Sequence, residues 1–194
     1  MPDQEVRCVY FEVVGPQNTR RTLELARERA EALGIKHVIV ASVSGRTGAQ
    51  AAELFKGYRL IVVTHSTGFN APNAQEFLPE YRALIEQAGG QILTCQHALG
   101  GFARAVRRKL GTYQLDEIVA FVLRNFCEGI KVACEVTLMA ADAGLVPAGE
   151  EVMAIGGTGK GVDTAAVILA AHAQDFFDLR VLEIVCKPRT AGKR

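Results

Sequence analysis

Short apolar runs alternate with segments of helical periodicity in the first half of the chain. Runs rich in aliphatic and β-branched residues predict buried strands over residues 37–42, 59–64 and 91–95. Segments with apolar residues on one helical face predict helices over residues 19–33, 49–54 and 74–88. Buried strands that alternate with helices favour a parallel sheet covered by helices on both faces.

The pattern changes between residues 97 and 147, where helical segments follow one another without a strand. They are predicted over residues 101–110, 114–126 and 129–143. We interpret this part as a helical insertion, and the chain as a single domain over residues 1–194.

Strands return after this part, at residues 151–155 and 164–169. The glycine-rich link between them is too short for a parallel crossover, so they form a hairpin. Residues 6–14 and 179–187 predict the first and last strands. The expected fold is a three-layer α/β domain with a mostly parallel sheet, an antiparallel last hairpin and the helical insertion.

The composition is that of an ordinary globular domain, with 49% hydrophobic residues, 22% charged residues and a formal net charge of +1. This charge gives no basis for nucleic-acid binding, and the basic cluster at 104–109 is interpreted as a solvated helix face. Neither a membrane-spanning stretch nor a secretory signal is expected. The five cysteines are odd in number and lack C-x-x-C spacing, which favours reduced thiols, a cytoplasmic protein and no metal site.

Two glycine-rich strings directly follow predicted strands. They are Ser44, Gly45, Arg46, Thr47 and Gly48, and then Gly157, Thr158, Gly159, Lys160 and Gly161. A helix that begins beside such a loop offers backbone N–H groups and a partial positive charge to a phosphate, and glycine lets the backbone come close. The strings therefore predict two sides of a phosphate site at the C-terminal edge of the sheet.

Neither string is a nucleotide-binding fingerprint. Lys160 is followed by Gly161 where a Walker A motif has Ser or Thr, Ala154 replaces its first glycine, and neither string fits G-x-G-x-x-G. The competing interpretation is that these glycines only form the tight turns that any α/β domain needs.

Two histidines are candidates for ligand contact or proton transfer. His65 and His97 each follow a predicted parallel strand, at the edge where α/β sheets bind ligands. Imidazole suits acid–base work near neutral pH. We place His65 among the expected ligand-binding residues and leave catalytic roles open for both.

Three carboxylates have open roles. Glu135 lies in a helix that is apolar nearly all round, so it needs a partner, either Lys131 four residues earlier or a ligand. Asp142 lies two turns further on, where it shares a face with Glu135 or caps the end of the helix. Asp163 follows the second glycine string, where it binds a ligand hydroxyl or stabilises the turn.

The order of elements and loops resembles the C-terminal α/β domain of pyruvate kinase. The resemblance rests on residues 38–47, 60–64 and 156–163, and covers roughly residues 19–95 and 150–170. The whole chain is similar to small stand-alone proteins of prokaryotes built on that domain, with residues 132–145 and 176–179 as further family-like strings. That likeness implies no particular reaction.

In pyruvate kinases that respond to a sugar bisphosphate, the two corresponding loops hold the phosphates of the effector. The resemblance therefore implies that residues 44–47 bind one phosphate and that residues 157–161 close over the ligand. The catalytic barrel has no counterpart here, so pyruvate kinase activity is not expected. The chain has no tryptophan, whereas the late loop of those kinases carries one, so bisphosphate specificity does not transfer.

Two functions remain at this point. The first is binding of a phosphorylated small molecule, a sugar phosphate, a nucleotide or FMN, as in a metabolite sensor. The alternative is an enzyme that uses the same site, with His65, His97 or Glu135 in acid–base roles. A homo-oligomer is also expected, because one small sheet cannot cover the apolar sides of all the helices between residues 97 and 147.

Overall fold

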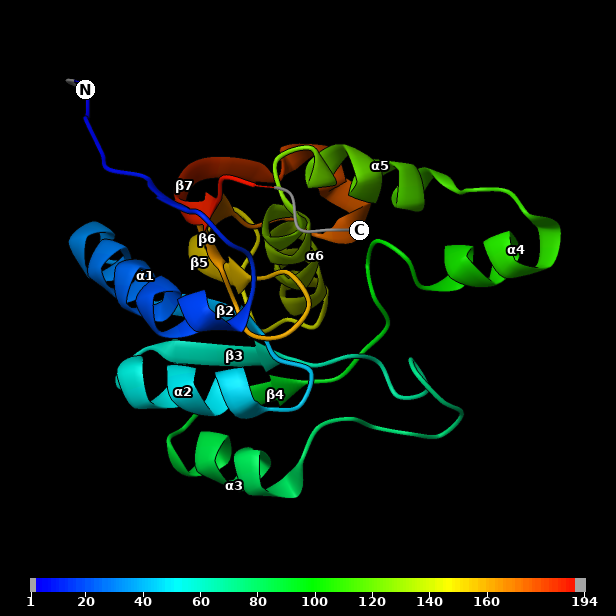
Figure 1. Ribbon diagram of the computed structural model, residues 1–194, viewed down its shortest axis with the longest axis horizontal. Helices are drawn as coiled ribbons and strands as arrows, with labels where there is room; N and C mark the ends of the chain where they lie inside the picture. Colours follow the sequence, from blue (N-terminus) through cyan, green and yellow to red (C-terminus); the bar gives the residue numbers. More distant parts are fainter. Residues whose placement is uncertain (1–2, 191–194) are drawn as a thin grey trace.

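A seven-stranded sheet forms the middle layer of the molecule (Figure 1). The structure is a computed structural model and describes residues 3–190. The strands lie in the order β1-β7-β6-β5-β2-β3-β4. Their bounds are β1 Val9–Phe11, β2 His37–Ala41, β3 Arg59–Val63, β4 Gln91–Leu93, β5 Glu151–Gly156, β6 Thr164–Leu169 and β7 Arg180–Pro188.

The sheet is mostly parallel. Strands β2, β3, β4 and β5 run in one direction, whereas β6 is antiparallel to both β5 and β7. Strand β1 joins β7 in parallel at the edge. The predicted fold class is confirmed, including the antiparallel hairpin that the second glycine-rich loop closes between β5 and β6.

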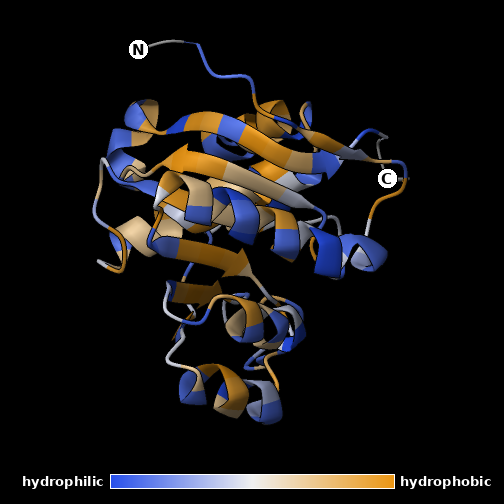
Figure 2. Cartoon of the chain, turned by 90° about the vertical axis from the view of Figure 1, so that its left-hand side faces the viewer, coloured by the Kyte–Doolittle hydropathy of each residue, from blue (hydrophilic) through white to orange (hydrophobic). Residues whose placement is uncertain are grey.

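Helices cover both faces of this sheet. Helices α1, α2 and α3 pack against one face, and α6 packs against the other with α5 on its outer side. The helix bounds are η1 Pro16–Asn18, α1 Thr19–Leu33, α2 Arg46–Leu54, α3 Pro79–Gln87, α4 Phe102–Leu110, α5 Leu115–Arg124, α6 Glu128–Asp142 and η2 Ala173–Asp178. Most of the helices show both hydrophilic and hydrophobic residues along their length (Figure 2).

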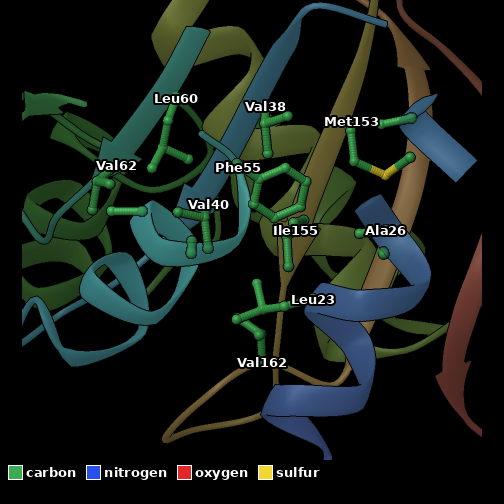
Figure 3. Packing of buried hydrophobic residues seen from close by; sticks show 14 of the residues in the cluster. Leu23, Ala26, Val38, Val40, Phe55, Leu60, Val62, Met153, Ile155 and Val162 are labelled. Carbon is green, nitrogen blue, oxygen red and sulfur yellow. The ribbon is translucent and has the colours of Figure 1, made fainter. Parts of the chain in front are cut away.

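Successive side chains of a strand face opposite sides, so each central strand contributes to two cores. In β2, Val38 and Val40 pack with α1 and α2, while Ile39 packs with α6. Figure 3 shows the first core, with Phe55 among side chains of the strands. Burial on both faces explains why these strands are continuous apolar runs in the sequence.

Helix α6 is an integral layer of the fold. Ile130, Ala133 and Ala140 pack on the sheet, while Leu138 packs with Ala120 of α5. The helix is apolar nearly all round because both of its sides are covered. Within the segment interpreted as an insertion, it is therefore α4 and α5 that lie outside the sheet layers, and α4 projects from the body (Figure 1).

Exposed apolar side chains gather on α4, α5 and the loops that flank them. They are Phe102, Leu110, Tyr113, Leu115, Ile118, Phe121, Val122 and Phe126. The two helices are held together by an ion pair between Arg107 and Glu117, with a distance of 2.8 Å. Within the described residues, none of the helices is both long enough and apolar enough to cross a membrane.

Three elements have a boundary that differs from the prediction by three residues or more. Strand β1 is shorter than residues 6–14 because it pairs only with the last residues of β7. Helix α2 begins at Arg46 rather than at residue 49, so most of the first glycine-rich string forms its first turn. Helix α3 begins at Pro79 rather than at residue 74, because Leu78 is extended and donates its N–H to the Ser44 carbonyl.

Gly48 provides a test of how closely α2 packs on the sheet. A Cβ there would lie 2.7 Å from Cγ1 of Val62 and 2.9 Å from Cδ1 of Ile85. We expect Gly48→Ala to lower the free energy of unfolding by about 1–3 kcal/mol, because overpacking outweighs the better helix propensity of alanine. Urea denaturation measures the change. The exposed Glu53→Ala on the same helix is the control, and equal stability of both variants would contradict the packing argument.

Candidate functional site

A cavity of about 850 Å³ lies at the carboxyl ends of β2, β3 and β5. The chain order reverses at β2, since β3 and β4 lie on one side of it and β5, β6 and β7 on the other. Open α/β sheets bind ligands at such a reversal, because the connections diverge and leave a crevice outside the strand ends. The cavity is the candidate site by this rule.

Three helices begin at the wall of this cavity. It is lined by Thr19 and Arg20 of α1, Arg46 and Thr47 of α2, and Glu128, Lys131 and Val132 at the start of α6. The N-terminus of a helix carries a partial positive charge and unpaired backbone donors. Three such ends around one space favour a negatively charged ligand.

The first glycine-rich string contributes only some of its residues to the wall. Ser44, Arg46 and Thr47 line the cavity, but Gly45 and Gly48 do not. Gly45 has a φ of +94°, and a Cβ there would lie 2.6 Å from Cβ of Tyr81. These two glycines therefore serve the turn and the packing of α2, as the competing interpretation holds.

Sequence reasoning missed Ser42, which supports this loop. Its Oγ accepts a hydrogen bond of 3.1 Å from the Gly48 N–H, in the first turn of α2. The hydroxyl thereby satisfies a backbone donor that would otherwise be unpaired. A serine at the end of a buried strand and six residues before that donor carries no distinctive sequence signal.

The second string also lines the cavity, through Gly157, Gly159, Lys160 and Gly161 but not Thr158. The loop docks on the start of α1, where the Val162 N–H donates to Thr19 Oγ1 at 3.1 Å. Residues of both predicted loops thus line the same cavity.

Asp163 anchors the second loop. The side chain is fully buried, and Oδ2 accepts a hydrogen bond of 2.9 Å from the Gly15 N–H. Oδ1 accepts another from Thr164 Oγ1 at 3.0 Å. Both oxygens are used within the protein, so the contacts favour the structural role among the two considered for Asp163.

Several cations surround the cavity, and they differ in their partners. Arg20 is paired with Glu24 at 2.7 Å, and Arg124 with Glu128 at 2.6 Å. Within residues 3–190, Arg46 and Lys160 form no ion pair, and both are exposed. Arg104 also lines the cavity without an ion pair among the described residues, but its guanidinium lies over the Phe69 ring. Arg46 and Lys160 are therefore the exposed cations that a ligand can bind without breaking an existing contact.

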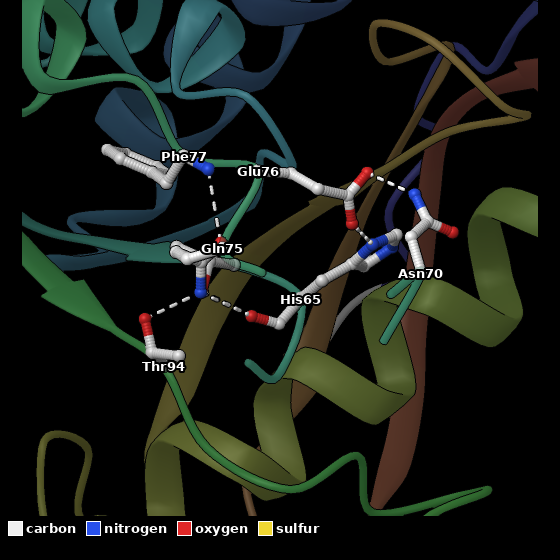
Figure 4. A network of polar contacts seen from close by, with 7 residues as sticks. His65, Asn70, Gln75, Glu76, Phe77 and Thr94 are labelled. Carbon is white, nitrogen blue, oxygen red and sulfur yellow. Dashed lines mark hydrogen bonds and ion pairs between the residues drawn. The ribbon is translucent and has the colours of Figure 1, made fainter. Parts of the chain in front are cut away.

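His65 belongs to a polar network that holds the segment between β3 and α3 (Figure 4). Its Nδ1 lies 2.8 Å from Oε2 of Glu76, whose other oxygen accepts from Asn70 Nδ2 at 2.6 Å. Gln75 Nε2 donates to the His65 carbonyl at 3.1 Å. His65 lines the cavity, but its Nδ1 is engaged by this network.

Phe69, on the same segment, connects the two histidines. Its ring centroid lies 4.0 Å from that of His65 and 5.0 Å from that of His97, with an angle of 23° to the latter. The Arg104 guanidinium lies 4.6 Å above the Phe69 ring. Residues 66–73 show no periodicity and residues 74–78 were assigned to a helix, so neither Phe69 nor the contact from α4 was predicted.

Glu135 is buried at the cavity wall together with Lys131. Lys131 Nζ donates to Oε2, as the spacing of four residues predicts, and the Leu99 N–H donates to Oε1 at 3.0 Å. His97 Nδ1 lies 3.7 Å from Oε2. Burial alone would raise the pKa of Glu135, but His97 and Lys131 outweigh it and lower this pKa to about 2. The carboxylate is therefore ionised at neutral pH.

Asp142 does not share this site. Its Oδ1 accepts from the Ala173 N–H at 2.9 Å and lies 3.4 Å from Nδ1 of His172. It therefore ties the end of α6 to η2, away from the cavity lining. Within the described part of the chain, no three His, Cys, Asp or Glu side chains are grouped to hold a metal ion.

The architecture is that of an α/β domain with a cavity at its topological reversal. Residues 20–168 match the family described as "Pyruvate kinase, alpha/beta domain". Because the match covers well over half of the chain, the protein belongs to this family.

Solved structures of pyruvate kinase from Cryptosporidium parvum are similar to this chain. One has 12% identity and a TM-score of 0.41, and the match covers 79% of this chain and 23% of the kinase. The kinase in complex with ADP also has 12% identity and a TM-score of 0.41, and the match covers 79% of this chain and 24% of the kinase. An O-ureido-L-serine synthase has 23% identity and a TM-score of 0.31, over 64% of this chain and 48% of the synthase. The chain thus spans less than a quarter of the length of these kinases.

The buried carboxylate predicts a specific acid sensitivity. Because the pKa of Glu135 is lowered from 4.5 to about 2, its ionised form stabilises the fold above pH 4.5, and this contribution disappears as pH falls to 2. We expect a loss on the order of 3 kcal/mol over this range that Glu135→Gln does not show. Urea denaturation at several pH values gives the free energy of unfolding as a function of pH for the wild type and for Glu135→Gln. Parallel curves for both proteins would contradict the assignment.

Proposed function

We propose that this chain binds a phosphorylated small molecule, such as a sugar phosphate, a nucleotide or FMN, in the cavity at the C-terminal edge of the sheet. One observation carries the proposal: three helix N-termini and two exposed cations without an ion pair, Arg46 and Lys160, surround the same space. The volume of about 850 Å³ is within the range of small-molecule sites. Family membership supports the same location, since the two loops correspond to those that the resemblance assigned to phosphates.

The biological role that we propose is that of a metabolite sensor. The five cysteines are free thiols in the structure, which supports the reducing cytoplasm as the location. A phosphorylated metabolite is available there as ligand. The acid–base alternative concerns the same cavity and is developed below.

Binding should be visible as thermal stabilisation. A ligand at about 100 times its Kd adds roughly 2.7 kcal/mol, which raises the Tm of a chain of this size by about 5–10 °C. We expect at least one compound in a panel of sugar phosphates, nucleotides and FMN to give such a shift. Arg46→Ala should abolish it and leave the ligand-free Tm nearly unchanged, because an exposed arginine without an ion pair contributes little to folding.

Arg27→Ala is the matched control, since Arg27 is exposed on α1 but does not line the cavity. It should retain the full shift. A panel that gives no Tm shift, or an Arg46→Ala protein that binds as the wild type does, would overturn the binding proposal. The glycine strings would then only form turns.

We also propose that the protein is a homo-oligomer. The support is the group of exposed apolar side chains on α4 and α5, among them Leu115 at 75% and Phe102 at 76% exposure. Light scattering should give a mass that is a multiple of the 20.9 kDa chain. Leu115→Glu should lower that mass, whereas a monomeric wild type at micromolar concentration would refute the proposal.

A further inference from the structure

We propose that the cavity is also a proton-transfer site, in which His97 is the catalytic acid–base residue and Glu135 is its positioning residue. The proposal rests on the proposed function, because it requires that a phosphorylated molecule binds in the cavity. Its substrate class is a phosphorylated aldehyde or ketone.

The two nitrogens of His97 have different surroundings. Nδ1 lies 3.7 Å from Oε2 of Glu135, whereas Nε2 is buried and has no hydrogen-bond partner within residues 3–190. A carboxylate beside Nδ1 favours the tautomer with the proton on that nitrogen. The lone pair then lies on Nε2, which is the nitrogen that can accept a proton from a ligand. An unpaired buried nitrogen is costly in a purely structural histidine.

Glu135 is held so that it can orient the imidazole. The Leu99 N–H binds Oε1 at 3.0 Å, and Lys131 binds Oε2. With both oxygens fixed, the carboxylate cannot rotate away from His97. The ionised carboxylate also stabilises the imidazolium that forms when Nε2 accepts a proton. A purely structural ion pair between Lys131 and Glu135 needs no third partner. A structural role therefore does not explain why His97 also contacts the carboxylate.

The wall beside His97 can change shape. Phe69 stacks on the imidazole, and Arg104 covers Phe69. Because Nε2 is buried, a ligand reaches it only after a local movement. Residues 66–78, which carry Phe69, contain neither helix nor strand and form the least regular part of this wall. We assign the movement to this segment.

The chemistry follows from a base next to an anion site. Nε2 takes a proton from the carbon beside the carbonyl: the C–H bond breaks, its electron pair stays on the substrate as an enolate, and an N–H bond forms. Return of a proton from His97 to the same carbon regenerates the carbonyl compound and the neutral imidazole. No oxidant or reductant is needed. Carbonyl compounds fit best because their adjacent C–H bonds are acidic enough for an imidazole base.

Deuterium exchange tests this step directly. Dihydroxyacetone phosphate, glyceraldehyde 3-phosphate and fructose 6-phosphate are incubated with the protein in D₂O, and loss of the α-proton signal is followed by NMR. We expect exchange with at least one probe, and a loss of about 10²-fold or more in His97→Asn. Glu135→Gln should retain partial activity with a shifted pH profile. His172→Asn is the matched control, because His172 is about 41% exposed and does not line the cavity.

The melting temperatures of the same samples separate the possible failures. Probes that raise the Tm of the wild type but undergo no exchange would overturn the catalytic proposal and leave the binding proposal standing. Probes that neither exchange nor shift the Tm would overturn the catalytic proposal for this substrate class, and the wider panel then decides on binding. Equal exchange by wild type and a folded His97→Asn would assign His97 a structural role.

Discussion

The close approach of α6 to the sheet determines the form of the site. Gly129 lies so near β6 that a Cβ would overlap the side chain of Thr164, and a Cβ at Gly156 would lie 2.5 Å from the Gly129 backbone oxygen. Because no side chain separates these backbones, the N-terminus of α6 reaches the edge of the sheet where the loops after β2 and β5 begin. The helix therefore covers the second face of the sheet and also supplies one wall of the cavity.

The same approach has an energetic consequence. It buries Lys131 and Glu135, which are 6% and 4% exposed. Burying two charges costs several kcal/mol per ion unless they are paired and hydrogen-bonded, and apolar residues of similar size often replace such a pair without loss of stability. The contacts from Leu99 and His97 satisfy the carboxylate. They offset the free-energy cost of burying the two charges, but the pair adds no clear stabilisation of the fold. A buried charge cluster at a cavity is better explained by what it does to a ligand than by stability.

The sequence predicted the elements whose hydrophobic pattern is strong. Helix α1 and strand β6 have the predicted bounds, and the two glycine-rich loops were placed at one edge because both follow parallel strands. Phe69 was not found because residues 66–73 have no hydrophobic period. Glu76 was not found because it was assigned to a helix expected from residue 74, whereas α3 begins at Pro79. The positions of both side chains depend on contacts with His65 and α4. The role of α6 was underestimated: its apolar residues on every side already indicate a helix covered on both sides, as a layer of the fold is.

The glycines that first suggested a phosphate site are the weaker part of that argument. Gly45 and Gly48 lie against Tyr81 and Val62, and neither lines the cavity. What favours an anion is instead the convergence of α1, α2 and α6, together with Arg46 and Lys160. The N-terminus of a helix keeps its positive potential whichever residues occupy the turn, whereas a glycine only allows a ligand to approach the backbone closely. The case for a phosphorylated ligand therefore depends on topology, because the reversal at β2 is what brings these helix ends to one place.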